Sequence, residues 1–173
     1  MKHLSLAVLI SALLTSVAAS ANERLFFQIP AMLDPSAPIP EAVKNECALD
    51  TLLGNYALSA INQRIGSVQS VTAPEQAGAD KVAQLTILSV HAPGGGMWSG
   101  SKSMSIRVDV RKEGATVDST ILTRRAKAGG YSTCGMLERT AAALGKDVAV
   151  WLSRGSAAKP NVSGSETAEP SDE

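Results

Sequence analysis

VAQLTILSVH, residues 82–91, decides the fold, because Val, Ile and Leu occupy both of its alternating positions. A strand that is apolar on both faces is typical of the covered middle of a sheet. The next stretch, SKSMSIRVDVR at residues 101–111, alternates apolar and polar residues and predicts a strand with one solvated face. After a tight turn at residues 112–114, ATVDSTILTRRAK at residues 115–127 returns as the second arm of a hairpin.

Two amphipathic helices are predicted on either side of these strands in the sequence. Over residues 40–64 apolar side chains recur at three- and four-residue spacing, and Pro40 suits the first turn of a helix. A second helix is predicted over residues 134–153, with Ser132 or Thr133 as its N-cap.

The chain upstream of the first helix contributes one further strand. RLFFQI, residues 24–29, is short, aromatic and branched, which favours a strand. Four prolines between residues 30 and 40 then predict a loop, and TAPEQAGAD, residues 72–80, predicts another after the helix.

The predicted order is β-α-β-β-β-α, an α+β fold with a mixed four-stranded sheet and two helices packed on one face. Crossovers between parallel strands are right-handed in nearly all proteins, so the first two strands run parallel. Following the chain direction through the remaining elements makes both helices begin at the same edge of the sheet.

The only two cysteines, Cys47 and Cys134, lie in the early turns of the first predicted helix and at the start of the second. The predicted topology brings them to one end of the sheet, so we expect a disulfide, against the alternative of two buried free thiols. A bridge between residues so far apart in sequence typically stabilises a fold by about 2–4 kcal/mol. It also removes both thiols as candidate metal ligands or nucleophiles.

Residues 1–21 have the features of a cleavable export signal. Lys2 precedes an apolar run, and Ala19-Ser20-Ala21 is a small-residue cleavage site, so we expect cleavage after Ala21. The run is shorter than the roughly 20 apolar residues that span a bilayer, and no lipid-acceptor cysteine follows it. We therefore expect a periplasmic protein with one α/β domain at residues 22–154 and a disordered acidic tail at residues 155–173.

The charge balance argues against two classes of partner. The chain has 16 basic and 16 acidic residues, and Lys2 is the only full charge in the signal. Neither nucleic acid nor an anionic membrane is expected to bind so neutral a chain, and six aromatic residues make no stacking platform for bases. Four arginines are predicted on the exposed face of the hairpin, either as its solvated face or as a contact for an acidic partner or the tail: Arg107, Arg111, Arg124 and Arg125.

The element order and the closing helix, which ends in DVAVWL at residues 147–152, resemble the small α/β domain of bacterial envelope proteins. That group includes the amino-terminal domain of TolB, the curli secretion lipoprotein and the lipoprotein activators of penicillin-binding proteins. The resemblance covers about residues 24–152. It implies a protein that binds other envelope components and is not an enzyme.

The sequence contains partial matches to catalytic motifs, but each match lacks the neighbouring residues or elements that its chemistry requires. GGGMWSGSKS, residues 94–103, lacks the lysine of a phosphate-binding loop and leads into a strand instead of a helix. Ser99 and Lys102 match the S-x-x-K pattern of penicillin-recognising enzymes without the lysine-threonine-glycine element that completes that site. His91 is the only histidine outside the signal, which excludes a histidine cluster for a metal. We expect no enzyme activity, no cofactor and no metal.

The edge where both helices begin is the candidate binding site. Glycines there allow close approach of a partner, helix N-termini favour anions, and Trp98 and Tyr131 offer contact area. We expect an unidentified envelope protein to bind there, with a small anionic ligand, bound for transport or sensing, as the alternative. A third interpretation is that the glycines only form long turns and Trp98 covers the core. The predicted binding residues are Gly94, Gly95, Gly96, Trp98, Ser99, Gly129, Gly130 and Tyr131.

Overall fold

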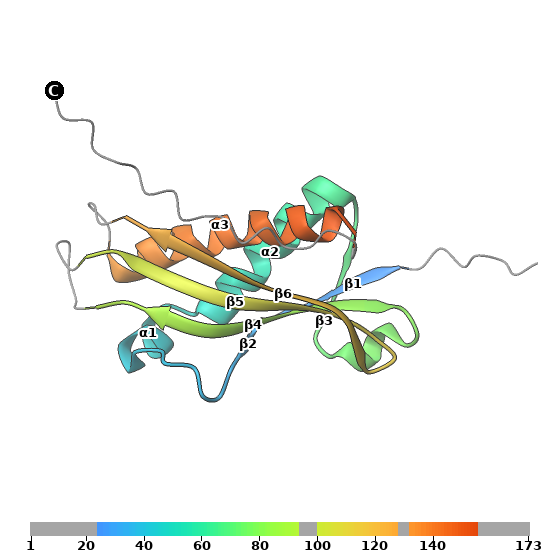
Figure 1. Cartoon of the computed structure of the whole chain (residues 1–173), viewed down its shortest axis with the longest axis horizontal. Coiled ribbons are helices and arrows are strands. Elements are labelled where there is room, and N and C mark those ends of the chain that lie inside the picture. The colour runs from blue at the N-terminus through green and yellow to red at the C-terminus, as the bar shows by residue number, and fades with distance from the viewer. Residues whose placement is uncertain (1–23, 94–99, 128–131, 156–173) are drawn as a thin grey trace, which may run out of the picture.

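A computed structural model describes residues 24–93, 100–127 and 132–155 (Figure 1). Within these residues the sheet has the strand order β3-β1-β4-β5-β6, with β2 paired to β4 outside that path. The strands are β1 (Leu25–Gln28), β2 (Met32–Leu33), β3 (Gln69–Val71), β4 (Lys81–His91), β5 (Lys102–Lys112) and β6 (Ala115–Ala126). The helices are α1 (Glu41–Glu46), α2 (Leu49–Ile65), α3 (Thr133–Ser153) and a short 3-10 helix at Pro74–Ala77.

The predicted central strand and hairpin are confirmed. β4 pairs in parallel with β1 and antiparallel with β5, which in turn pairs antiparallel with β6. Both faces of β4 are buried: Leu85 and Ile87 lie in the main core, while Val82 belongs to a second cluster that the 3-10 helix covers at Ala77. The alternation of β5 is confirmed too, with every second residue buried from Lys102 to Val110.

The predicted four-stranded sheet with two helices is wrong in detail. β2 lies in the proline-rich segment predicted as a loop, and its two residues pair with Thr86 and Ile87 of β4. β3 pairs in parallel with β1 and extends the sheet at that margin. Strands of two and three residues are too short to establish a period of two, so the sequence pattern could not indicate them.

The first predicted helix is also divided. α1 ends at Glu46 with Cys47 as its C-cap, and Ala48 has a left-handed backbone with φ of 43° before α2 begins. Cys47 therefore caps the end of α1 and does not lie in the early turns of one continuous helix. The apolar spacing persists across the break because Val43, Cys47 and Leu49 all enter the same core.

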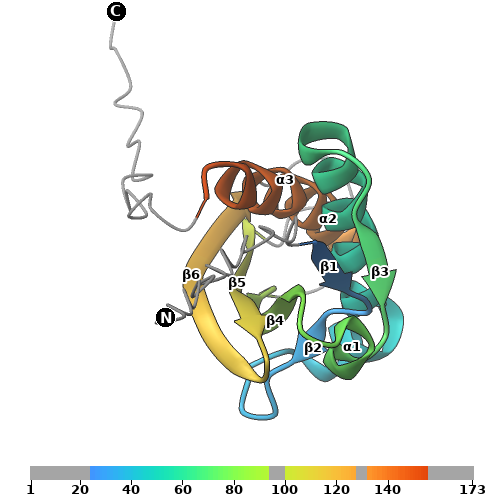
Figure 2. The ribbon, with the colours of Figure 1, turned by 90° about the vertical axis from the view of Figure 1, so that its right-hand side faces the viewer.

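α2 and α3 pack side by side on one face of the sheet, leaving β3 and β6 at its two margins (Figure 2). Their backbones approach closely at Gly145, where an added Cβ would lie 2.8 Å from Ala57 N and 2.8 Å from Tyr56 C. At the far end of the pair, Arg64 Nε donates to Ser153 Oγ at 2.8 Å. A glycine at residue 145 thus sets the distance between the helices.

Substituting Gly145 with alanine should destabilise the protein even though alanine is the better helix former by about 1 kcal/mol. The new methyl group would meet rigid backbone of α2, and overpacking of this kind costs about 1–3 kcal/mol. Urea unfolding of residues 22–173 measures the loss. Gly54→Ala is the matched control: its Cβ would meet the Ile29 side chain at 3.0 Å, which can shift, so the loss should be smaller. A Gly145→Ala protein as stable as the parent would contradict the close approach.

Candidate functional site

Three chain segments meet at one end of the sheet, which we call the loop end. Here β4 ends at His91, β5 begins at Lys102 and α3 begins at Thr133 (Figure 1). Residues 94–99 and 128–131 connect to this end. The predicted binding residues Gly94, Gly95, Gly96, Trp98, Ser99, Gly129, Gly130 and Tyr131 lie outside the described residues, as do the export signal and the tail from residue 156.

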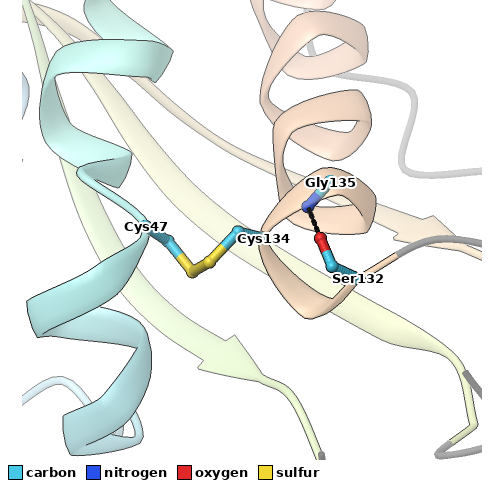
Figure 3. The surroundings of a disulfide bond; sticks show 4 residues. All are labelled: Cys47, Ser132, Cys134 and Gly135. Carbon is cyan, nitrogen blue, oxygen red and sulfur yellow. Dashed lines mark hydrogen bonds between the residues drawn. A yellow bond between two sulfur atoms is a disulfide. The ribbon is translucent and has the colours of Figure 1, made fainter. Parts of the chain in front are cut away.

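A disulfide fixes the loop end. Cys47 and Cys134, 87 residues apart, are bridged with their Cα atoms 5.1 Å apart, which confirms the predicted bond (Figure 3). Ser132 is the N-cap of α3 and its Oγ accepts a hydrogen bond from Gly135 N at 3.1 Å (Figure 3). The bridge therefore ties the break between α1 and α2 to the capped start of α3.

A shallow groove of about 400 Å³ opens at the loop end, lined by residues 38–40 and 90–93. Ile39 and Val90 are buried at its base, whereas His91 is exposed at its rim. Val90 N donates to Pro38 O at 3.4 Å, so the two walls are joined by backbone. Apart from His91, every lining side chain is apolar.

Lys102 lies at the loop end, and the sequence analysis considered it only as part of the S-x-x-K pattern. It is fully buried, and its Nζ donates to Pro93 O at 2.6 Å. Lys102 is the first residue of β5, so its ammonium group holds Pro93, at the end of the groove wall, next to the start of that strand. The alternation of β5 contained the signal, because Lys102 falls on the same face as Met104 and Ile106.

A turn at residues 34–36 leads into the groove. Asp34 Oδ1 accepts hydrogen bonds from Ser36 N at 2.8 Å and Ser36 Oγ at 2.6 Å. These bonds, with a smaller contribution from the charge of Arg107, hold the pKa of the Asp34 carboxyl below its usual value. Asp34 N also donates to Ile87 O at 3.0 Å, which attaches the turn to β4.

The predicted arginine cluster is only partly formed. Arg107, Arg111 and Arg125 share the face of the hairpin that α2 and α3 leave uncovered. Arg124 lies on the opposite face, where its Nε donates to Asp147 of α3 at 2.5 Å. The prediction was wrong for Arg124 because adjacent residues of a strand point to opposite faces.

Residues 24–93, 100–127 and 132–155 contain no group of three His, Cys, Asp or Glu side chains placed to hold a metal ion. No helix among them is long and apolar enough to cross a membrane.

Removing the disulfide should lower stability by about 2–4 kcal/mol, because the unfolded chain then regains the freedom that the bridge removes. Urea unfolding of a Cys47→Ser/Cys134→Ser protein, compared with the parent, measures this. Reductant should shift the parent to the same stability and leave the double-serine protein unchanged. Two thiols that react with maleimide in the folded parent before any reductant is added would contradict the bridge.

The Asp34 turn should respond to pH. A carboxyl with a lowered folded pKa contributes stability above its unfolded pKa, and that contribution is lost as pH falls through the folded value. A carbon-detected NMR titration should therefore show Asp34 ionising below the usual range for Asp, and Ser36→Ala should raise its pKa toward that range. An unchanged Asp34 pKa in Ser36→Ala would contradict the assigned cause.

No protein-family model matches this sequence, and no curated protein does so either. Solved structures do resemble it. A PelC variant crystallised as a dodecamer, from Paraburkholderia phytofirmans, has a TM-score of 0.51 and 16% identity over 73% of this chain and 85% of that chain. A DUF330 protein from Xanthomonas campestris has a TM-score of 0.48 and 8% identity, over 75% of this chain and 83% of that one.

A minor lipoprotein from Acinetobacter baumannii follows, with a TM-score of 0.41 and 14% identity, over 76% of this chain and 91% of that one. Of these three likenesses only that to PelC exceeds a TM-score of 0.5, and its low identity makes it a likeness of fold. The chain shares the fold of PelC.

Proposed function

We propose that this chain is a non-enzymatic accessory protein of the bacterial cell envelope, exported to the periplasm, that binds another envelope protein at the loop end of its sheet. The observation that carries the proposal is the apolar groove at the loop end, lined by residues 38–40 and 90–93. One of the two glycine-rich segments predicted to bind a partner, residues 94–99, directly follows Pro93 of this groove in the sequence.

The lining of the groove favours a protein partner over a small anionic ligand. Sites for small ligands combine an enclosing cavity with several converging polar groups. The groove is shallow, and of its side chains only that of His91 is polar. Three of its seven residues belong to the segment Pro38–Pro40, whose two prolines have restricted backbones and lose little freedom when a partner binds.

The rigidity of this end supports the same function. The hydrogen bonds from Val90 N to Pro38 O and from Lys102 Nζ to Pro93 O hold the groove walls, while the bridge between Cys47 and Cys134 ties the helices together near the start of α3. A surface that is organised before binding spends less free energy on ordering when the complex forms. A disulfide in this position also agrees with an oxidising compartment such as the periplasm.

The fold shared with PelC supports a role in an assembly. PelC is described as a dodecamer, so this fold is compatible with contacts between protein subunits.

Site-directed photo-cross-linking in the periplasm tests the proposal. A photoreactive amino acid at the exposed His91 should give a discrete cross-linked product with an envelope protein. The same amino acid at the exposed Gln69, in β3 at a margin of the sheet, is the matched control and should not give that product. Introducing Ala92→Asp into the groove should reduce the His91 product about tenfold, because a buried unpaired charge opposes an apolar contact.

Two results would refute this function. Equal products from residues 91 and 69 would mean that the loop end is not the contact. Cross-linking that is absent at His91, together with saturable binding of a small anion to the purified protein, would favour the ligand-binding alternative.

A further inference from the structure

β6 forms one margin of the sheet along its full length of 12 residues (Figure 2). Among the described residues, its only strand partner is β5, and no other backbone hydrogen bond between those residues reaches residues 115–126. The margin that faces away from β5 therefore presents the donors and acceptors of alternate residues over about 40 Å of strand.

β6 carries few of the devices that usually prevent an edge strand from pairing; its register with β5 shifts only near its start, where Val117 is the extra residue. Residues 115–126 include neither proline nor lysine, and the stretch STILT at residues 119–123 is uncharged and rich in β-formers. Val117 and Ile121 are 50% and 58% exposed, and Ile121 lies opposite Arg107 on the uncovered face. At the opposite margin, by contrast, β3 has only three residues.

We propose that β6 pairs antiparallel with β6 of a second copy of this chain, across a two-fold axis at Ile121. Charge complementarity fixes this register. When Ile121 of one copy lies opposite Ile121 of the other, Asp118 of each copy lies opposite Arg124 of its partner. The two-fold axis therefore gives two such contacts in each dimer. Both residues point to the helix side of the sheet, where their cross-strand neighbours Val110 and Met104 are buried.

Neighbouring registers lose this match. When two strands continue one sheet, each side chain must stay on its own face. The two-fold axis must therefore pass through a residue, and the neighbouring registers place it at Thr120 or at Leu122. With the axis at Thr120, Arg124 faces Thr116 and Asp118 faces Leu122. With the axis at Leu122, Arg124 faces Thr120 and Asp118 faces Ala126. Only the axis at Ile121 opposes unlike charges, which stabilises a cross-strand pair.

The arginine is already positioned for this contact. Arg124 Nε and Nη2 donate to the carboxylate of Asp147 on α3 at 2.5 and 2.7 Å, and this ion pair raises the pKa of the guanidinium. The side chain is thus held over β6 on the helix side, with further N–H groups available to a carboxylate from the next strand. The pairing uses a margin of the sheet distinct from the groove at the loop end, so it does not depend on the proposed function.

Sedimentation of residues 22–173 over a range of concentrations should show a monomer–dimer equilibrium. Asp118→Arg and Arg124→Asp should each weaken the dimer about tenfold or more, because each places like charges opposite one another twice. Mixing the two variants should restore dimers, since both unlike pairs re-form in the mixed species. Circular dichroism of each variant checks that it is folded.

Cysteine cross-linking tests the register even if one charge variant fails to fold. Ile121→Cys should cross-link to itself with a short bismaleimide, because the two copies meet at that residue. Val117→Cys, at an exposed residue of the same strand, is the control and should not, because residue 117 lies opposite Arg125 of the other copy. A protein that stays monomeric at every concentration would overturn the proposal, as would self-cross-linking through residue 117 that equals or exceeds that through residue 121.

Discussion

The close approach of α2 and α3 at Gly145, together with the disulfide between Cys47 and Cys134, determines most of what the molecule presents to its surroundings. The glycine lets the two helices lie backbone against backbone, and the bridge joins them at the end where α3 begins. Because both helices cover one face of the sheet, the other face of the β5–β6 hairpin has no helix over it. The loop end and the margin at β6 are consequences of this arrangement.

These two surfaces differ in chemistry, and so suit different partners. The groove at the loop end is apolar, and its walls are held by the hydrogen bond from Val90 to Pro38 and by the buried ammonium of Lys102. The margin at β6 offers backbone hydrogen bonds and the opposite charges of Asp118 and Arg124. A protein that binds an envelope component at one surface and a second copy of itself at the other can link several partners, and neither contact requires a catalytic group.

The sequence predicted those features that depend on long, regular patterns. Residues 82–91 are apolar at both alternating positions and form the central strand, and the period of two in β5 correctly assigned its buried face. The pairing of Cys47 with Cys134 followed from topology. The features that were not predicted were short or local. β2 and β3 have too few residues to show a period of two. The break at Ala48 requires a left-handed backbone, which an alanine in the sequence does not indicate. Lys102 was missed because a charge was not expected on a buried face, although the period placed it there.

Hydrogen exchange of the oxidised protein, resolved by residue with NMR, tests whether α2 and α3 form a rigid layer on the sheet while the outer margin of β6 is unpaired. Amides within β4, α2 and α3 should exchange only through global unfolding. Amides of β6 that point away from β5 should exchange much faster in dilute solution and become protected as the concentration rises. Equal, concentration-independent protection of all β6 amides, or local opening of α2 and α3 before the sheet unfolds, would contradict this account.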